Sequence, residues 1–230
     1  KTGFFFDQRD NRHYVSLFAK DKRVLNLFSY SGGFSIYAGS GGAKNVMSVD
    51  MAQGALELAD KAWVESGLDP QKHQSCCEDV FEFLDKKNEE WDLMIVDPPS
   101  MTHSEKQKHK AVQAYTELFA QAMAQLSSQG HLFLSSCSSH ISFEDFFEII
   151  NDNKKCPQLC LIGDERQLIY KYKNADYRFM NLADKIFILL ESDFLNKLKD
   201  VGITGLKPSI SKESNAISSV IFWSKYNSFL

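Results

Sequence analysis

The sequence predicts an α/β fold in which a mainly parallel sheet carries helices on both faces. The first observation is that short apolar runs alternate with longer amphipathic runs along the chain. The second is that the apolar runs are continuous, which is typical of strands buried on both faces. The third is that several of these runs end in an acidic or small polar residue and lead into a helical pattern. Alternation of this kind favours parallel strands that are joined by helices.

The elements follow one another in a regular order. The expected strands are 23–28 ("RVLNLF"), 45–50 ("NVMSVD"), 74–77 ("QSCC"), 91–97 ("WDLMIVD") and 130–136 ("GHLFLSS"). Helices are expected at 52–66, 79–87, 108–126 and 142–152, and directly after Gly33. A later strand candidate is "KIFILLE" (185–191), whereas the segment after residue 192 is rich in turn residues and polar. We therefore expect one domain over residues 1–191 and a C-terminal extension of unknown role over residues 192–230.

The composition of the 230 residues limits the class of protein. A hydrophobic content of 43% and a charged content of 24% suit a globular protein with an apolar core. The net charge of −4 lacks the basic character that nucleic-acid binders show overall. No apolar stretch approaches the ~18 residues of a membrane span, and the opening "KTGFFFDQRDNR" does not resemble a signal peptide.

The five cysteines are an odd number, and they lack the spacing of a zinc site. Free thiols, a cytoplasmic location and no metal are therefore expected. The sequence also begins without a methionine, which suggests a fragment of a longer protein or a processed chain.

A glycine-rich turn follows the first strand. Gly32 and Gly33 lie in "VLNLFSYSGGFSIYA", between that strand and the next expected helix. Parallel α/β sheets bind ligands at the carboxyl ends of their strands, where such a turn lets the backbone come close. The pattern G-x-G-x-x-G is absent, which disfavours a nicotinamide dehydrogenase and suits an adenosyl ligand without a pyrophosphate. A plain structural turn is the alternative.

Three aspartates end or follow successive strands. Asp50 ends "NVMSVD", Asp79 follows "SCC" in "CCEDVFEF", and Asp97 ends "WDLMIVD". The carboxyl ends of parallel strands share one edge, and a carboxylate at Asp50 can accept hydrogen bonds from both hydroxyls of a ribose. Each aspartate taken singly could be a helix N-cap, Asp79 above all. Three of them beside a glycine-rich turn favour a ligand site.

The corner "DPPS" (97–100) and Cys137 carry the most specific chemistry. Two prolines fix the chain just beyond a strand, so that Asp97 can face a planar polar ring such as a nucleobase. Cys137 ends the next strand, where a thiol could be a packing residue, a metal ligand or a nucleophile. If the two strands are neighbours, Asp97 and Cys137 face one pocket. A thiolate that adds to C6 of cytosine makes C5 nucleophilic, and Asp97 can hydrogen-bond or protonate N3.

Six stretches together resemble a known family. They are "KTGFFFDQRDNR", "VLNLFSYSGGFSIYA", "GGAKNVMSVDMAQGALELA", "DVFEFL", "DLMIVDPPS" and "SSCSSHIS". They resemble the class I S-adenosylmethionine-dependent methyltransferases that modify C5 of cytosine in large-subunit ribosomal RNA (rRNA). The resemblance covers residues 1–150 and, more weakly, continues to residue 190. It implies a Rossmann-like sheet of seven strands, the last of them antiparallel with "KIFILLE" as its candidate, and S-adenosylmethionine as the cofactor.

The resemblance also implies a role for individual residues. Cys137 would be the catalytic nucleophile, and Asp97, Pro98, Pro99 and Ser100 would hold the target base. The cofactor contacts that it implies are Phe6, Gln8, Arg9, Ser29, Tyr30, Gly32, Gly33, Asp50, Met51, Asp79, Val80 and Asp97. Of these, Met51, Asp79 and Val80 would lie beside the adenine. The resembled family usually carries an N-terminal RNA-binding domain of the PUA type, which is not found in this sequence.

Two local segments are candidate RNA contacts. "HSEKQKHK" (103–110) offers Lys106 and Lys108 to phosphates beside a flipped base, and "RDNRHY" (9–14) offers Arg12. The solvated start of a helix is the alternative for the first segment. The expected partner is thus large-subunit rRNA, with no membrane contact and with a homodimer left open.

Two other functions stay open. A sister group with the same "DPP" corner methylates N2 of guanine, but it has an asparagine-rich stretch where this sequence has "SSCSS". The chain could also be an inactive cofactor- and RNA-binding factor in ribosome assembly. Cys137 favours the cytosine enzyme, because methylation of an exocyclic amine needs no thiol.

Overall fold

Seven strands form one sheet in the part of the chain that the structure describes. This computed structural model describes residues 8–86, 89–102, 104–136, 138, 140–141, 143–152, 158–161 and 219–225. The strands are β1 (Arg23–Leu27), β2 (Asn45–Asp50), β3 (His73–Cys77), β4 (Trp91–Val96), β5 (Leu126–Ser136), β6 (Gln158–Leu161) and β7 (Ser219–Lys225). They lie in the order β3-β2-β1-β4-β5-β7-β6, and every neighbouring pair is parallel. The expected α/β class is confirmed.

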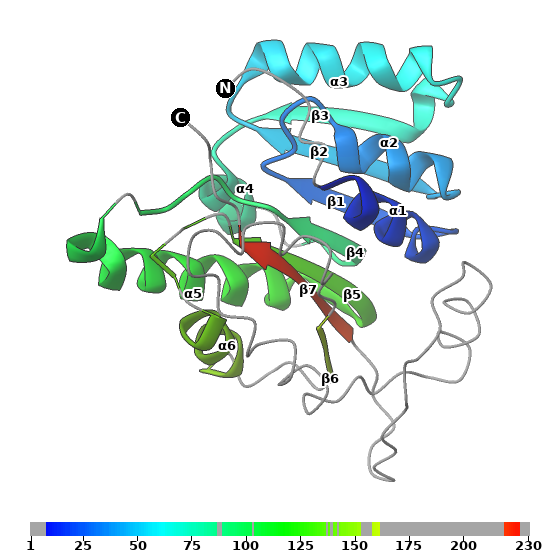
Figure 1. Cartoon of the computed structure of the whole chain (residues 1–230). Helices are drawn as coiled ribbons and strands as arrows, with labels where there is room; N and C mark the ends of the chain where they lie inside the picture. The colour runs from blue at the N-terminus through cyan, green and yellow to red at the C-terminus, as the bar shows by residue number, and fades with distance from the viewer. Residues whose placement is uncertain are drawn as a thin grey trace, which may run out of the picture.

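The central strands are apolar because helices cover both faces of the sheet. Figure 1 shows α1 (Arg9–Phe18), α2 (Gly33–Ser40) and α3 (Gln53–Glu65) on one side, and α4 (Val80–Lys86), α5 (Lys108–Ala124) and α6 (Phe143–Asp152) on the other. Side chains of β5 alternate between the two layers, since Phe133 packs in the cluster with α1 and α2, whereas Leu132 and Leu134 pack with α5 and α6. Each such buried Leu or Phe stabilises the fold by about 1.5–3 kcal/mol.

The register brings the carboxyl ends of the strands together. Leu27 of β1 is level with Val49 of β2 and with Val96 of β4, and Val96 is level with Leu134 of β5. Each helical crossover returns the chain to the opposite end of the sheet, so the loops that follow these strands share one edge. This edge is where the sequence placed the candidate site.

Helix α1 was not predicted as a helix. Its buried apolar residue is Val15, which packs with Phe18 and with the C-cap residue Ala19, and the other positions are mostly polar or charged. A spacing of three and four residues over so short a stretch gives little periodic signal. The sequence offers this segment as a candidate RNA contact through Arg12 and, by the resemblance, as a cofactor contact through Arg9.

Strand β5 starts at Leu126, earlier than the expected residue 130. Leu126 pairs with Trp91 and His131 pairs with Leu93, with a shift of register between the two pairs. The intervening "SSQG" is polar and ends in glycine, so it reads as a turn although it belongs to an irregular part of the strand.

The far side of the sheet differs from the expectation. β7 comes from the segment 192–230 and lies between β5 and β6, parallel to both. The antiparallel last strand that the resemblance implied is therefore not found among the described strands, and "KIFILLE" lies outside the described residues. A parallel pairing of β6 with β7 requires a crossover connection between the two strands.

Candidate active site

The loop after β1 has an unusual backbone conformation. Phe28, Tyr30 and Gly32 have positive φ angles of 56°, 47° and 75°. For the two non-glycine residues this region costs on the order of 1–3 kcal/mol each. Backbone hydrogen bonds hold the loop, because the Ser29 N–H donates to the Val49 carbonyl oxygen at 3.0 Å and the Gly32 N–H donates to the Ser29 carbonyl oxygen at 2.9 Å. Strain of this kind clusters at ligand sites.

Asp50 ties this loop to the end of β2. Its Oδ2 accepts a hydrogen bond from the Tyr30 N–H at 2.8 Å, and its Oδ1 accepts one from the Ala52 N–H at 2.9 Å. Each carboxylate oxygen has a second acceptor position, so Asp50 can hold the loop and still receive ribose hydroxyls. The next residue, Met51, is 69% exposed, which leaves an apolar side chain open at the edge where adenine was expected.

Gly32 and Gly33 lie where α2 begins. Gly32 is the N-cap residue, and a Cβ at this position would lie 2.6 Å from the Cβ of Ala59 in α3. Gly32 therefore has a packing reason as well as the expected ligand reason. No side chain caps the first turn of α2 in the described residues, so its N–H groups are available to an anion such as an amino-acid carboxylate.

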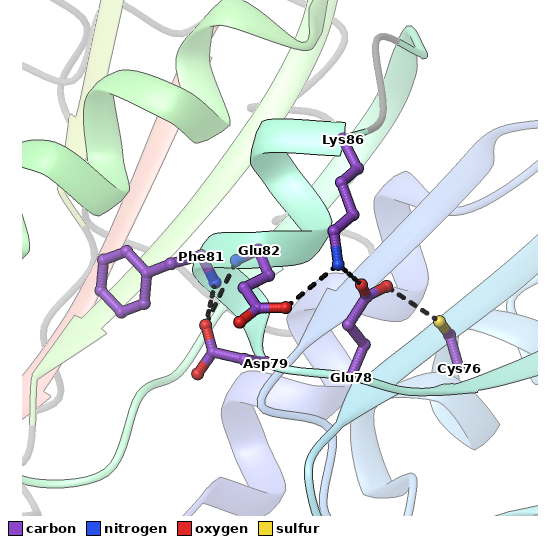
Figure 2. A network of polar contacts seen from close by, with 6 residues as sticks. All are labelled: Cys76, Glu78, Asp79, Phe81, Glu82 and Lys86. Atoms are coloured by element: carbon purple, nitrogen blue, oxygen red, sulfur yellow. Dashed lines mark hydrogen bonds and ion pairs between the residues drawn. The ribbon is translucent and has the colours of Figure 1, made fainter.

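Asp79 caps helix α4. Figure 2 shows its Oδ1 facing the backbone nitrogens of Phe81 and Glu82, which donate hydrogen bonds at 2.9 and 3.2 Å. The N-cap that the sequence left open is thus present, and the expected adenine contact would use the second carboxylate oxygen. Val80 is 1% exposed and packs in the core, so its contact with a ligand would have to come from the backbone.

A polar network orders the loop between β3 and α4. In Figure 2 the Lys86 ammonium lies between the carboxylates of Glu78 and Glu82, at 2.6 and 3.0 Å, and the Cys76 thiol points to Glu78 at 3.8 Å. Hydrogen bonds to Glu78, which contributes most, and to Glu82 raise the pKa of Lys86 above its ordinary value. The Glu78 N–H donates to the Asp50 carbonyl oxygen at 3.1 Å, so the network also reaches the end of β2.

The corner after β4 lies against the end of β5. The Ser135 hydroxyl donates a hydrogen bond to Asp97 Oδ1, so a side chain two residues before Cys137 contacts the predicted catalytic carboxylate. Pro98 is buried and Pro99 is exposed, as expected of a rigid corner that presents one side to solvent. The predicted adjacency of these two strands is confirmed, whereas Cys137 itself lies outside the described residues.

A cluster of hydroxyl groups joins the corner to β5 from the other side. The Ser136 hydroxyl donates to the Tyr115 hydroxyl at 3.0 Å, and the Tyr115 hydroxyl lies 3.0 Å from Ser138 Oγ. Ser138 Oγ accepts from the Met101 N–H at 3.0 Å and lies 3.4 Å from Ser100 Oγ. The sequence reading missed Tyr115, which is fully buried and resembles any other core position of α5. The hydroxyl-rich "SSCSS" was the only available signal for the serines.

Two ion pairs connect the predicted basic loop with α6 and the residues before it. Lys108 Nζ lies 2.7 Å from Asp145 Oδ2, and His140 Nδ1 lies 3.3 Å from Glu105 Oε2. Lys108 is thus partly neutralised rather than open to phosphate. Lys106 is exposed, and its predicted RNA contact stays a prediction.

The start of the described chain is more buried than expected. Gln8 and Asn11 are 2% and 4% exposed, and the Asn11 side-chain amide donates to Gln8 Oε1 at 2.8 Å. Arg12 is 3% exposed, with its guanidinium carbon 5.7 Å from the centre of the Tyr37 ring. A phosphate contact needs an accessible guanidinium, so this placement favours a structural role for Arg12. Arg9 is exposed, and Phe6 lies outside the described residues.

Among the described residues, no three His, Cys, Asp or Glu side chains lie close enough to hold a metal ion. None of the described helices is long and apolar enough to span a membrane.

Comparison with known proteins identifies the family. The family described as S-adenosylmethionine-dependent methyltransferases matches residues 1–166. A ribosomal RNA large subunit methyltransferase of Deinococcus radiodurans is 40% identical over 65% of this chain, and ribosomal RNA large subunit methyltransferase I of Aeromonas salmonicida is 42% identical over 66%. The chain spans about two fifths of the length of these relatives, 38% and 39% respectively.

Solved structures agree with this assignment. A protein from Streptococcus mutans described as a proposed SAM-dependent methyltransferase superposes with a TM-score of 0.58 at 29% identity, over 69% of this chain and 42% of its own. SMU.776, a proposed methyltransferase complexed with SAH, gives a TM-score of 0.56 at 30% identity, over 66% of this chain and 41% of its own. S-adenosylmethionine as the cofactor is confirmed, and the chain belongs to the family of S-adenosylmethionine-dependent methyltransferases.

Proposed function

We propose that the protein methylates C5 of a cytosine in large-subunit rRNA through a covalent adduct with Cys137. The contact of Ser135 with Asp97 carries the proposal, because it brings the end of β5 to the corner that would hold the base. The names of the relatives from Deinococcus radiodurans and Aeromonas salmonicida support large-subunit rRNA as the substrate. A cytoplasmic site of action, where ribosomes are built, belongs to the same proposal.

The loops after β1, β2 and β3 would hold the cofactor. Asp50 has acceptor positions left for the ribose hydroxyls, and the uncapped first turn of α2 suits the carboxylate of the methionine part. Met51 and the second oxygen of Asp79 lie on the side proposed for adenine. When bound, S-adenosylmethionine supplies an electrophilic methyl group.

The corner after β4 would hold the cytosine. Pro98 and Pro99 restrict the backbone, so that the Asp97 carboxyl group is presented in a fixed direction. Ser135, which contacts Asp97, lies two positions before Cys137 along the chain. The side chains of Ser136 and Ser138 contact Tyr115 of α5 instead.

The proposed chemistry needs a thiolate and an acid. The Cys137 thiolate would form a bond to C6, the electron pair of the C5–C6 double bond would shift to C4–C5, and the C4–N3 pair would move to N3, which Asp97 hydrogen-bonds or protonates. C5 would then take the methyl group as the bond from this group to the cofactor sulfur breaks, which leaves S-adenosylhomocysteine. A proton held on N3 would return to Asp97. Loss of the C5 proton to solvent and expulsion of the thiolate restore the double bond and the free enzyme.

A flipped base would leave its flanking phosphates near the loop at 104–108. Lys106 is the exposed cation of that loop, while Lys108 is held by Asp145. A phosphate contact by Lys106 would weaken with rising salt, as expected of a site that releases counterions.

The test is mass mapping of 23S rRNA from cells with and without the full-length gene, complemented with wild type or with Cys137→Ala. We expect one 5-methylcytosine that disappears on deletion, returns with wild type and does not return with Cys137→Ala. A product on a guanine amine, or full methylation by Cys137→Ala, would contradict the covalent scheme. Cofactor binding without any change in the rRNA would instead point to an assembly factor.

A further inference from the structure

The buried hydroxyl of Tyr115 has contacts that packing alone does not require. Tyr115 is fully buried in α5, and its ring packs against Phe119 and Phe146 with centroid distances of 5.6 and 5.9 Å. A phenylalanine would make the same ring contacts. Its hydroxyl, however, lies 3.0 Å from both Ser136 Oγ and Ser138 Oγ.

These hydroxyls form a directed chain between two loops. Ser136 donates to Tyr115, Tyr115 can donate to Ser138, and Ser138 Oγ accepts from the Met101 N–H. The Ser138 N–H turns back to Ser136 Oγ at 3.3 Å. With this orientation the Tyr115 hydroxyl holds Ser136 and Ser138, and Ser138 Oγ in turn contacts the loop directly after Ser100. Buried hydroxyls are costly when unsatisfied, so loss of the central member disturbs both loops.

We infer that Tyr115 is a positioning residue whose hydroxyl fixes the Asp97–Ser100 corner against the end of β5. The inference rests on the proposed function, since this corner and this strand end are the two walls proposed for the target base. Tyr115 does not touch the base in this arrangement. It acts from the α5 side of the sheet, opposite to the face on which Ser135 contacts Asp97.

The test compares Tyr115→Phe with Ser127→Ala in the full-length protein. Ser127 also makes a side-chain hydrogen bond between β5 and β4, to Asp92 Oδ1 at 3.2 Å, but at the far end of the strands. We expect Tyr115→Phe to lower kcat for rRNA methylation by about 10- to 100-fold, as misplacement of reacting groups does. The Kd for S-adenosylhomocysteine should stay within about twofold, because the loops after β1 and β2 are untouched. Ser127→Ala should leave both values unchanged.

Hydrogen exchange gives a readout that does not depend on activity. The amides of Met101 and Ser138 both donate to members of the cluster, so they should exchange about tenfold faster in Tyr115→Phe than in wild type. Ser138→Ala should show the same loss of kcat, and the double variant should lose no more than either single variant. Unchanged exchange and kcat in Tyr115→Phe would overturn the inference.

A failure of the proposed function would give other results than a failure of the role inferred for Tyr115. If wild type makes no 5-methylcytosine and Cys137→Ala changes nothing, the covalent scheme falls. Exchange at Met101 and Ser138 would still decide whether the Tyr115 hydroxyl fixes the corner.

Discussion

Gly32 offers a test of the cofactor half of the site, because a second glycine has the same backbone conformation in open surroundings. The φ angle is 75° at Gly32 and 74° at Gly67. A Cβ at Gly67 would meet nothing within 4 Å, whereas at Gly32 it would lie 2.6 Å from the Cβ of Ala59 and 3.3 Å from its Cα. Gly67→Ala therefore measures the cost of the left-handed conformation alone.

The expected magnitudes follow from this difference. The left-handed conformation costs an L-residue roughly 1–2 kcal/mol, so Gly67→Ala should lower the free energy of unfolding by about that amount. Gly32→Ala carries the same cost and adds overpacking of about 1–3 kcal/mol, since carbon atoms pack best at about 3.5–4.0 Å. The total is about 2–5 kcal/mol. The entropy that alanine removes from the unfolded chain is common to both variants and cancels in the comparison.

Urea unfolding of the two variants, with calorimetric titration of S-adenosylhomocysteine, provides the assay. We expect Gly32→Ala to weaken cofactor binding by at least about tenfold, because Gly32 must move and it begins α2. Gly67→Ala should bind normally. Adding Ala59→Gly to Gly32→Ala removes the Cβ of Ala59, the nearest atom to the new methyl group. The double variant should therefore be more stable, by at least about 1 kcal/mol of unfolding free energy, than the sum of the two single effects predicts. Equal destabilisation by Gly32→Ala and Gly67→Ala would refute the argument that α2 and α3 are in close contact there.

Three further predictions concern neighbouring elements. Gly54→Ala in α3 should raise the unfolding free energy by about 0.5–1 kcal/mol, because the new methyl group meets nothing within 4 Å and alanine is the better helix former. Asp79→Ala should lower the free energy of unfolding by about 1 kcal/mol, because the cap of α4 is lost. Asp79→Ser should keep most of this stability, because serine is also a good cap residue. Weaker S-adenosylhomocysteine binding by Asp79→Ser would assign its carboxylate to the cofactor, and unchanged binding would limit Asp79 to capping. Burial lowers the pKa of His73, in spite of the opposing effect of Asp60. The imidazole therefore binds a proton more readily in the unfolded state than in the folded state. The free energy of unfolding should fall as the pH drops below about 6.5. Urea unfolding between pH 7.5 and 5.0 should show that the free energy of unfolding falls less steeply in His73→Gln than in wild type. An equally steep fall would show that His73 is not the source of this pH dependence.

The sequence was sufficient to predict the edge of the sheet on which the candidate residues lie. The ends of strands, where Asp50 and Asp97 lie, can be located from the apolar runs that precede them. Parallel pairing then places both residues on one edge of the sheet. Asp79 shows the limit of this reasoning, because the same residue fits a cap and a ligand, and the two oxygens of its carboxylate could serve one role each. Local patterns of this kind carry no information about which role is realised.

Contacts between side chains far apart in sequence could not be predicted. Tyr115 is separated from Ser138 by 23 positions and sits in an ordinary apolar stripe of α5. Lys108 was considered for RNA because its charge is visible in the sequence, but its pairing with Asp145 depends on how α5 and α6 pack. The burial of Arg12 over Tyr37 likewise follows from the packing of α1 on α2.

The two halves of the edge are held together in different ways, and this has a consequence for the proposed enzyme. Backbone N–H groups and the Asp50 carboxylate fix the loops after β1 and β2, whereas serine and tyrosine hydroxyls fix the corner after β4. The two sets share no member, and distant sites without shared partners respond almost independently to substitution. Gly32→Ala should therefore act mainly on cofactor affinity, and Tyr115→Phe mainly on methyl transfer. If the double variant showed more than the sum of both effects on cofactor affinity, the two halves would have to move as one unit, and a separate positioning role for Tyr115 would be untenable.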